Sequence, residues 1–203
     1  MGFGICLIAS ALFLFELYGI ETVSFALFGY GFALLSETDK RFFPGVYISA
    51  AGLIPAVLRL LNIFGLIDLS SFDPTGLLLQ SVSASLLIAI YAVLFIGAKR
   101  IAVDNDANKL ASRCVTAVRI SSFVLSFFVL SSILFNLFAL QLSFAGQITG
   151  VFLALKYVTI AVMTVYIYFC YASISTPKLL RKEYKANMEL AEKEQKKKEK
   201  KEK

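Results

Sequence analysis

The stretch that decides the fold runs from Pro44 to Ile67 and reads PGVYISAAGLIPAVLRLLNIFGLI. It is apolar for about the length that a helix needs to cross a bilayer. Pro55 and Arg59 nevertheless lie inside it. An arginine at membrane depth costs about 2.5–3.5 kcal/mol on insertion scales, so it must find an anion, water or a route to the headgroups. We therefore expect other segments to supply partners for Arg59.

The composition predicts that the rest of the chain is also embedded in a membrane. Of 203 residues, 58% are hydrophobic, and the mean hydropathy is +0.76. A soluble domain of this size could not bury so much apolar surface. We therefore predict an all-α fold, a polytopic membrane helix bundle.

Residue types that carry catalysis or bind metal are scarce. The chain has no histidine, and Cys6, Cys114 and Cys170 are too scattered for a zinc or redox motif. No Gly-rich phosphate loop occurs, and the motifs of intramembrane hydrolysis are missing. Spacing leaves open a serine acting with Lys156. We expect no metal, no cofactor and no enzymatic activity.

The apolar run from Phe3 to Ser36 would be about 50 Å long as one helix, which exceeds the hydrocarbon thickness of a bilayer. Polar residues and a glycine interrupt it at Glu16, Gly19 and Glu21. We therefore predict a turn between two short helices, Phe3–Phe15 and Val23–Leu35. A single span, two short spans and a re-entrant hairpin all remain open.

This first hairpin resembles a group of uncharacterised small bacterial polytopic membrane proteins. The resemblance rests on Gly2-x-Gly4, the acidic break, Phe28-Gly29-Tyr30 and the ending Leu35-Ser36. It covers less than a quarter of the chain, and the Pro-Asp that usually precedes the Gly-Tyr of the group is missing. The resemblance implies a bacterial source and brings no activity with it.

Further along the chain, apolar segments alternate with polar connections. The predicted spans are Pro44–Ile67, Gly76–Ala98, Val118–Leu140 and Ile148–Ala172, which with the first hairpin makes about six membrane-embedded helices. The predicted connections are Glu37–Phe43, Asp68–Thr75, Lys99–Ala117 and Gln141–Gln147.

Small residues in the Pro44–Ile67 span predict close helix packing. Gly45, Ser49 and Gly52 recur on nearly one face, where they would let a neighbouring helix approach. Pro55 should kink or loosen the span near its middle. We expect both features to determine shape.

After residue 177 the composition changes abruptly, which divides the chain into a helical membrane domain, 1–177, and a tail, 178–203. The tail holds eleven Lys or Arg residues and six Glu residues, so it carries nearly all of the net charge of +6. Interleaved glutamates argue against nucleic acid as a partner. A solvated tail and contact with anionic lipid headgroups both remain open.

The positions of the basic residues predict the orientation. Lys or Arg occurs in the Glu37–Phe43 connection, the Lys99–Ala117 connection and the tail. Neither occurs in the alternate turns, Glu16–Thr22, Asp68–Thr75 and Gln141–Gln147. The positive-inside rule then places both termini in the cytoplasm, in a multi-pass protein of the plasma membrane.

This orientation brings several polar residues to the outer half of the membrane. The set is Glu16, Glu21, Arg59, Gln80, Asn136 and Lys156. In one interpretation, the two cations snorkel outward or pair with the two acids to satisfy buried charge. In the other, the set lines a polar pocket for a small solute.

The first interpretation predicts an accessory, scaffold or regulatory subunit without enzymatic activity, with the bilayer and another membrane protein as partners. The second predicts a subunit that binds or transports a small solute through the outer polar cluster.

Overall fold

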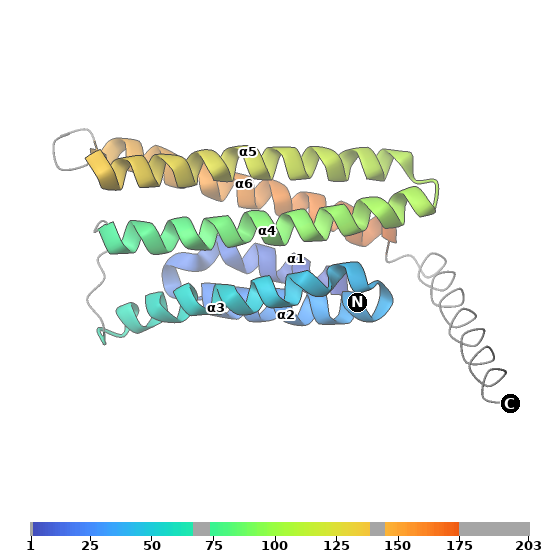
Figure 1. The fold of residues 1–203 in the computed structure, drawn as a ribbon, viewed down its shortest axis with the longest axis horizontal. Coiled ribbons are helices and arrows are strands. Elements are labelled where there is room, and N and C mark those ends of the chain that lie inside the picture. Colours follow the sequence, from blue (N-terminus) through green and yellow to red (C-terminus); the bar gives the residue numbers. More distant parts are fainter. Residues whose placement is uncertain (1, 67–73, 139–144, 175–203) are drawn as a thin grey trace, which may run out of the picture.

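The computed structural model describes residues 2–66, 74–138 and 145–174, and every regular element in these ranges is helical (Figure 1). The helices are α1 (Gly2–Leu12), α2 (Glu21–Thr38), α3 (Phe43–Ile63), α4 (Pro74–Asp104), α5 (Asn108–Phe138) and α6 (Ala145–Ile174). The all-α class and the bundle of six helices are thereby confirmed.

The helices form a closed ring in chain order. Each helix packs on the next, and α1 closes the ring on α6. Gly4 near the start of α1 faces the ring of Tyr171 near the end of α6, so the two ends of the described bundle lie on the same side (Figure 1). Short connections make neighbouring helices antiparallel. A ring in which all neighbours are antiparallel can close only with an even number of helices, and this ring has six.

In the part of the chain that the structure describes, four helical segments are long and apolar enough to cross a membrane, namely Lys40–Ile63, Leu78–Asp104, Asn108–Ile133 and Leu153–Ile174. Gly2–Phe15 is a shorter apolar helix. The chain is therefore a multi-pass membrane protein. Its inner and outer sides, and the tail at 178–203, lie outside what the described residues show.

The first apolar run is a hairpin, so a single straight span is excluded. A 3₁₀ helix at Phe13–Tyr18 follows α1, and Gly19 turns the chain with φ +74°. An L side chain rarely adopts this angle, and a Cβ there would lie 2.7 Å from the Leu60 side chain. The structure extends α2 beyond the predicted Val23–Leu35 helix at both ends.

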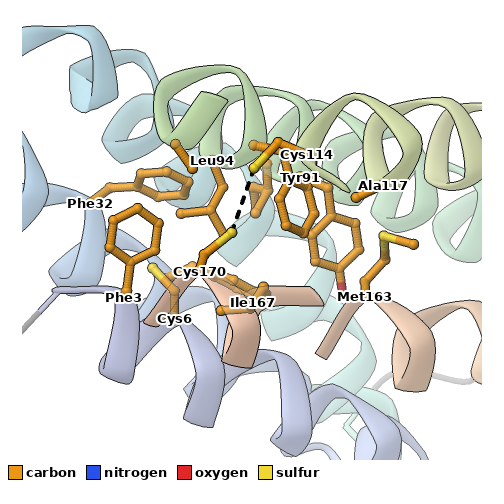
Figure 2. Packing of buried hydrophobic residues seen from close by; sticks show 14 of the residues in the cluster. Phe3, Cys6, Phe32, Tyr91, Leu94, Cys114, Ala117, Met163, Ile167 and Cys170 are labelled. Atoms are coloured by element: carbon orange, nitrogen blue, oxygen red, sulfur yellow. Dashed lines mark hydrogen bonds between the residues drawn. The ribbon is translucent and has the colours of Figure 1, made fainter. Parts of the chain in front are cut away.

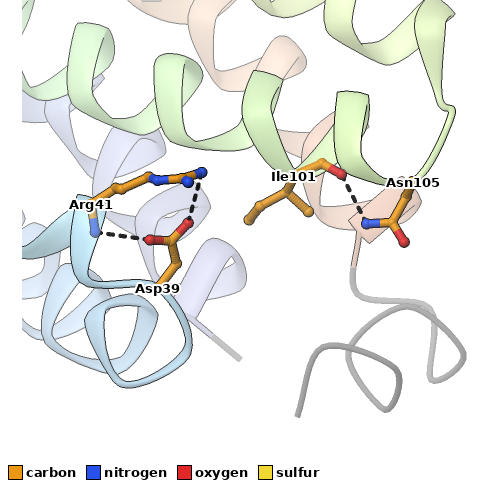
Figure 3. A network of polar contacts seen from close by, with 4 residues as sticks. All are labelled: Asp39, Arg41, Ile101 and Asn105. Carbon is orange, nitrogen blue, oxygen red and sulfur yellow. Dashed lines mark hydrogen bonds and ion pairs between the residues drawn. The ribbon is translucent and has the colours of Figure 1, made fainter. Parts of the chain in front are cut away.

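The predicted connection Lys99–Ala117 is wrong in length. Helix α4 continues to Asp104 and α5 begins at Asn108, so the turn is much shorter. Asn105 donates a side-chain hydrogen bond to the Ile101 carbonyl at 2.8 Å, and Asp106 takes φ 57° (Figure 3). Hydropathy marks where a helix leaves the hydrocarbon, but the helix itself goes on into water until a turn residue ends it.

The predicted loop Glu37–Phe43 is likewise mostly helical. Helix α2 ends at Thr38, and Lys40–Phe42 forms a 3₁₀ turn. The Asp39 carboxylate accepts a hydrogen bond from the backbone N–H of Arg41 at 2.9 Å and caps this turn (Figure 3). Pro44 lies in the first turn of α3, where its missing N–H costs nothing.

Close packing of α2 on α3 uses the predicted small residues of α3. A Cβ at Gly45 would meet the ring of Phe32, and a Cβ at Gly52 would meet the ring of Phe25. Ser49 is buried between these positions, and its hydroxyl has no hydrogen-bond partner among the described residues. Pro55 is buried in α3, which remains one helix across it. Aromatic rings of α2 therefore fill the space that glycine leaves on α3.

The cysteines lie in the core where α1, α4, α5 and α6 meet (Figure 2). All three thiols, Cys6, Cys114 and Cys170, are free and buried. The Sγ atoms of Cys114 on α5 and Cys170 on α6 are 3.7 Å apart. Their separation in the sequence gave no sign of this contact.

Candidate functional site

An ion pair inside the bundle joins α2 to α3. The guanidinium of Arg59 donates to the carboxylate of Glu21 at 2.7 Å between Nη1 and Oε2. The Glu21 side chain is 1% exposed and that of Arg59 is 15% exposed. Glu21 is the first residue of α2, where the helix dipole also favours a negative charge. The buried arginine therefore has its counter-ion.

The second carboxylate oxygen of Glu21 lacks a donor. Oε1 is buried without a hydrogen-bond partner among the described residues, and so is the hydroxyl oxygen of Thr22. A buried acceptor in this condition costs about 1–3 kcal/mol. The site therefore offers an unfilled acceptor next to a satisfied ion pair.

Lys156 lies in a different environment, on α6. Its side chain is completely buried, and its ammonium lies 5.4 Å from the centre of the Phe128 ring and 5.9 Å from that of Tyr157. Aromatic faces attract a cation, and more strongly where water is excluded. Lys156 thus stays within the bundle and does not reach out to the surface.

Buried hydroxyl groups gather in the same half of the molecule as Lys156. Gln80 on α4 is 7% exposed. The buried hydroxyl residues of α4, α5 and α6 are Ser81, Ser83, Ser121, Ser131, Ser132 and Thr159. Some of them bond back to their own helix, as Ser131 does to the Phe128 carbonyl at 2.9 Å. The Ser83 hydroxyl has no hydrogen-bond partner among the described residues.

A chain of hydroxyl groups at the centre of the bundle links three helices. The Ser10 Oγ of α1 is 3.0 Å from the Tyr91 Oη of α4 and 2.8 Å from the Thr164 Oγ1 of α6. The Thr164 hydroxyl donates its hydrogen bond to the Ile160 carbonyl at 2.8 Å. Ser10 must therefore donate to Thr164, and Tyr91 to Ser10. This chain of hydroxyl groups was not predicted from the sequence, where the signal for it was single hydroxyl residues within apolar segments.

The hydroxyl chain also gives a reference level for the buried charges. Glu21 precedes Phe28, whose ring contacts Tyr91, by about 10 Å of helix rise. Lys156 precedes Thr164 by about 12 Å on a helix that runs the same way. The Glu21–Arg59 pair and Lys156 therefore lie at a similar depth, away from the two chain ends.

The structure describes part of the predicted polar set. Glu21 and Arg59 are in contact, whereas Lys156 packs on α5 and α6 residues. The backbone of Glu16 belongs to the 3₁₀ helix after α1, but its side chain and that of Asn136 lie outside what the structure describes. Within the described ranges, no group of three His, Cys, Asp or Glu residues could hold a metal ion.

Arg119 was not among the polar residues singled out from the sequence. This residue lies on the exposed face of α5, inside the segment Asn108–Ile133 that is long and apolar enough to cross a membrane. An open groove of about 770 Å³ runs beside it, lined by Arg119, Ser122, Phe123, Ser126, Phe127 and Leu130. The available signal was a cation placed within an apolar run.

Comparison with known proteins found no matching family model, no matching curated protein and no matching solved structure. The resemblance of the first hairpin to small bacterial membrane proteins stays a prediction.

Proposed function

We propose that this chain is a non-enzymatic subunit of a bacterial plasma membrane, with an accessory, scaffold or regulatory role beside another membrane protein. The observation that carries this proposal is the Glu21–Arg59 pair, with 2.7 Å between its charged atoms and Glu21 almost fully buried. A charge that is already neutralised inside the fold is used for structure and is not presented to a substrate.

The hydroxyl chain supports the same conclusion. Ser10, Tyr91 and Thr164 bond to one another and so hold α1, α4 and α6 together. Helices in lipid lack a hydrophobic drive to associate, so hydrogen bonds and close packing must hold them. These interior polar groups therefore serve to build a stable platform of helices.

The orientation belongs to the proposal as well. The basic residues Lys99, Arg100, Lys109 and Arg113 flank the turn between α4 and α5, at the same end of the bundle as both ends of the described chain (Figure 1). The positive-inside rule assigns this end to the cytoplasm. The tail at 178–203 would follow on the same side.

The test is to purify the full chain from its native membrane in mild detergent, once with its unchanged sequence and once as the swapped variant Glu21→Arg/Arg59→Glu. We expect a membrane protein to co-purify in fixed stoichiometry with both forms, because the swap restores the internal pair. Asp39→Arg/Arg41→Asp is the matched control, since this pair is more exposed and its charged atoms are 3.6 Å apart. Retention of a small molecule and no protein would contradict the proposal.

A second candidate function is solute binding or transport through the outer polar cluster. The unfilled oxygen of Glu21 and the buried ammonium of Lys156 favour it, because both lie at a similar depth. Native mass spectrometry of the purified protein should then reveal a bound small molecule. Lys156→Met should lose it, whereas Lys109→Gln, a change at an exposed lysine, should keep it.

A further inference from the structure

The groove on α5 has a polar end and an apolar end. Arg119 lies nearest the turn that joins α4 to α5, the neighbours Ser122–Phe123 and then Ser126–Phe127 follow, and Leu130 lies farthest along the helix. Phe123, at the side of the groove, is 76% exposed. Among the described residues, those that line the groove all belong to α5, and most of them are exposed on the face of this helix that points away from the bundle.

Arg119 lies deeper than the other basic residues near this turn. It comes after Arg113 by about 9 Å of helix rise. Arg113 stacks on the ring of Phe169, with 4.7 Å between its guanidinium carbon and the ring centre. Within the described part of the chain, no carboxylate pairs with Arg119. A charge at that depth is stabilised by an anion, by water or by the lipid headgroups.

The order of groups along the groove selects the kind of occupant. A phospholipid has its anionic phosphate near the membrane surface and its acyl chains towards the middle. The two ends of the groove have this order, with the Arg119 guanidinium nearest the turn and Leu130 farthest from it, and serine and phenylalanine side chains alternate between them. A second protein chain would have to bring its own carboxylate to the same depth, which costs free energy.

The charge around the turn adds to this selection. The exposed basic residues near it are Lys99, Arg100, Lys109 and Arg113. Asp104 and Asp106 are the acidic residues of the turn, so the balance is positive. Basic sites of this kind on membrane helices bind anionic headgroups.

We propose that the α5 groove binds one anionic phospholipid, with the Arg119 guanidinium on its phosphate, Ser122 beside the headgroup, and Phe123, Phe127 and Leu130 along an acyl chain. The site is separate from the Glu21–Arg59 pair and from Lys156, and the proposal goes beyond a scaffold role. It gives the chain a lipid that remains bound when the bulk bilayer is removed.

The test uses the full chain in detergent with phosphatidylglycerol and phosphatidylcholine added in equal amounts, and native mass spectrometry to count bound lipids. We expect one phosphatidylglycerol to bind in preference to phosphatidylcholine. Arg119→Gln should lower that preference about fivefold, the effect of one basic residue at a headgroup. The free energy of unfolding in phosphatidylcholine alone should stay unchanged, because Arg119 is exposed.

Two further variants separate a groove from diffuse attraction. Ser126→Leu keeps every charge and fills the groove, so it should also lower the preference. Lys109→Gln removes an exposed charge outside the groove and should leave the single bound lipid in place. Equal losses with Arg119→Gln and Lys109→Gln, or no preference in the unchanged chain, would overturn the proposal. A lipid-free dimer that Arg119→Gln dissociates would overturn it too, because the groove would then bind a second copy.

Discussion

Helices α1–α3 and helices α4–α6 form the two halves of the ring (Figure 1). The buried charged residues of the two halves have different surroundings. In the first half, Arg59 is neutralised by Glu21, and phenylalanine rings fill the space beside glycines. In the second half, Lys156 lies among aromatic rings, in a part of the bundle rich in buried hydroxyls. The ion pair ties α2 to α3, and the rings of α2 leave no space beside the glycines of α3. The first half should therefore tolerate change less than the second.

Among changes that leave the Glu21–Arg59 pair intact, the largest effect should come from filling a glycine site in the first half. Gly52→Leu places a side chain where the Phe25 ring already lies, so one of the two must move. We expect a loss of about 1–3 kcal/mol in the free energy of unfolding, as for other overpacked cores. Thermal or denaturant unfolding of the full chain in detergent measures it.

Gly150→Leu is the matched control in the second half. A Cβ at Gly150 meets nothing within 4 Å, so a leucine there should cost much less. Equal losses at the two glycines would break the comparison between the halves.

A smaller effect should follow from a change where the halves meet. Tyr91→Phe removes the hydroxyl that donates to Ser10 and keeps the ring that contacts Phe28. One lost hydrogen bond of this kind costs about 0.5–1.5 kcal/mol. Ser10→Ala in the same background should then add less than it does alone, because the two residues share a bond. Full additivity would show that the hydroxyl chain does not couple the halves.

The smallest effect should come from Lys156→Met. The change keeps much of the side-chain volume and removes a fully buried charge, so the loss of its attraction to its neighbours, the Phe128 and Tyr157 rings among them, is offset by a lower desolvation cost. We expect the free energy of unfolding to change little or to rise. A loss as large as that of Gly52→Leu would mean that Lys156 holds the second half together.

Local sequence patterns predicted the class of the fold and much of the first half. Apolar runs gave the helices, and the glycine and acids between Phe15 and Val23 gave the turn of the hairpin. Charges of opposite sign at one expected depth pointed to Arg59 and the acids of the hairpin, and the structure places Arg59 on Glu21 and describes no side chain for Glu16.

The second half was less accessible to the same reasoning, because its features depend on which helices are neighbours. Cys114 and Cys170 are far apart in the sequence and yet their thiols are in contact. The Phe128 ring near Lys156 belongs to α5, and the expected depth of Lys156 in the membrane could not identify this neighbour. Helix α4 also extends beyond its apolar run to Asp104. Its end is determined by the turn residues Asn105 and Asp106 and not by hydropathy.

The account depends most on the claim that the buried charge of the first half serves the fold. A double-mutant cycle of Arg59→Met, Glu21→Gln and both together, read as free energies of unfolding in detergent, tests it directly. Arg59→Met alone should cost about 3–5 kcal/mol because it leaves Glu21 buried without its counter-ion, and the double change should recover most of that loss. Single changes that cost nothing, or a double change that costs their full sum, would contradict the claim.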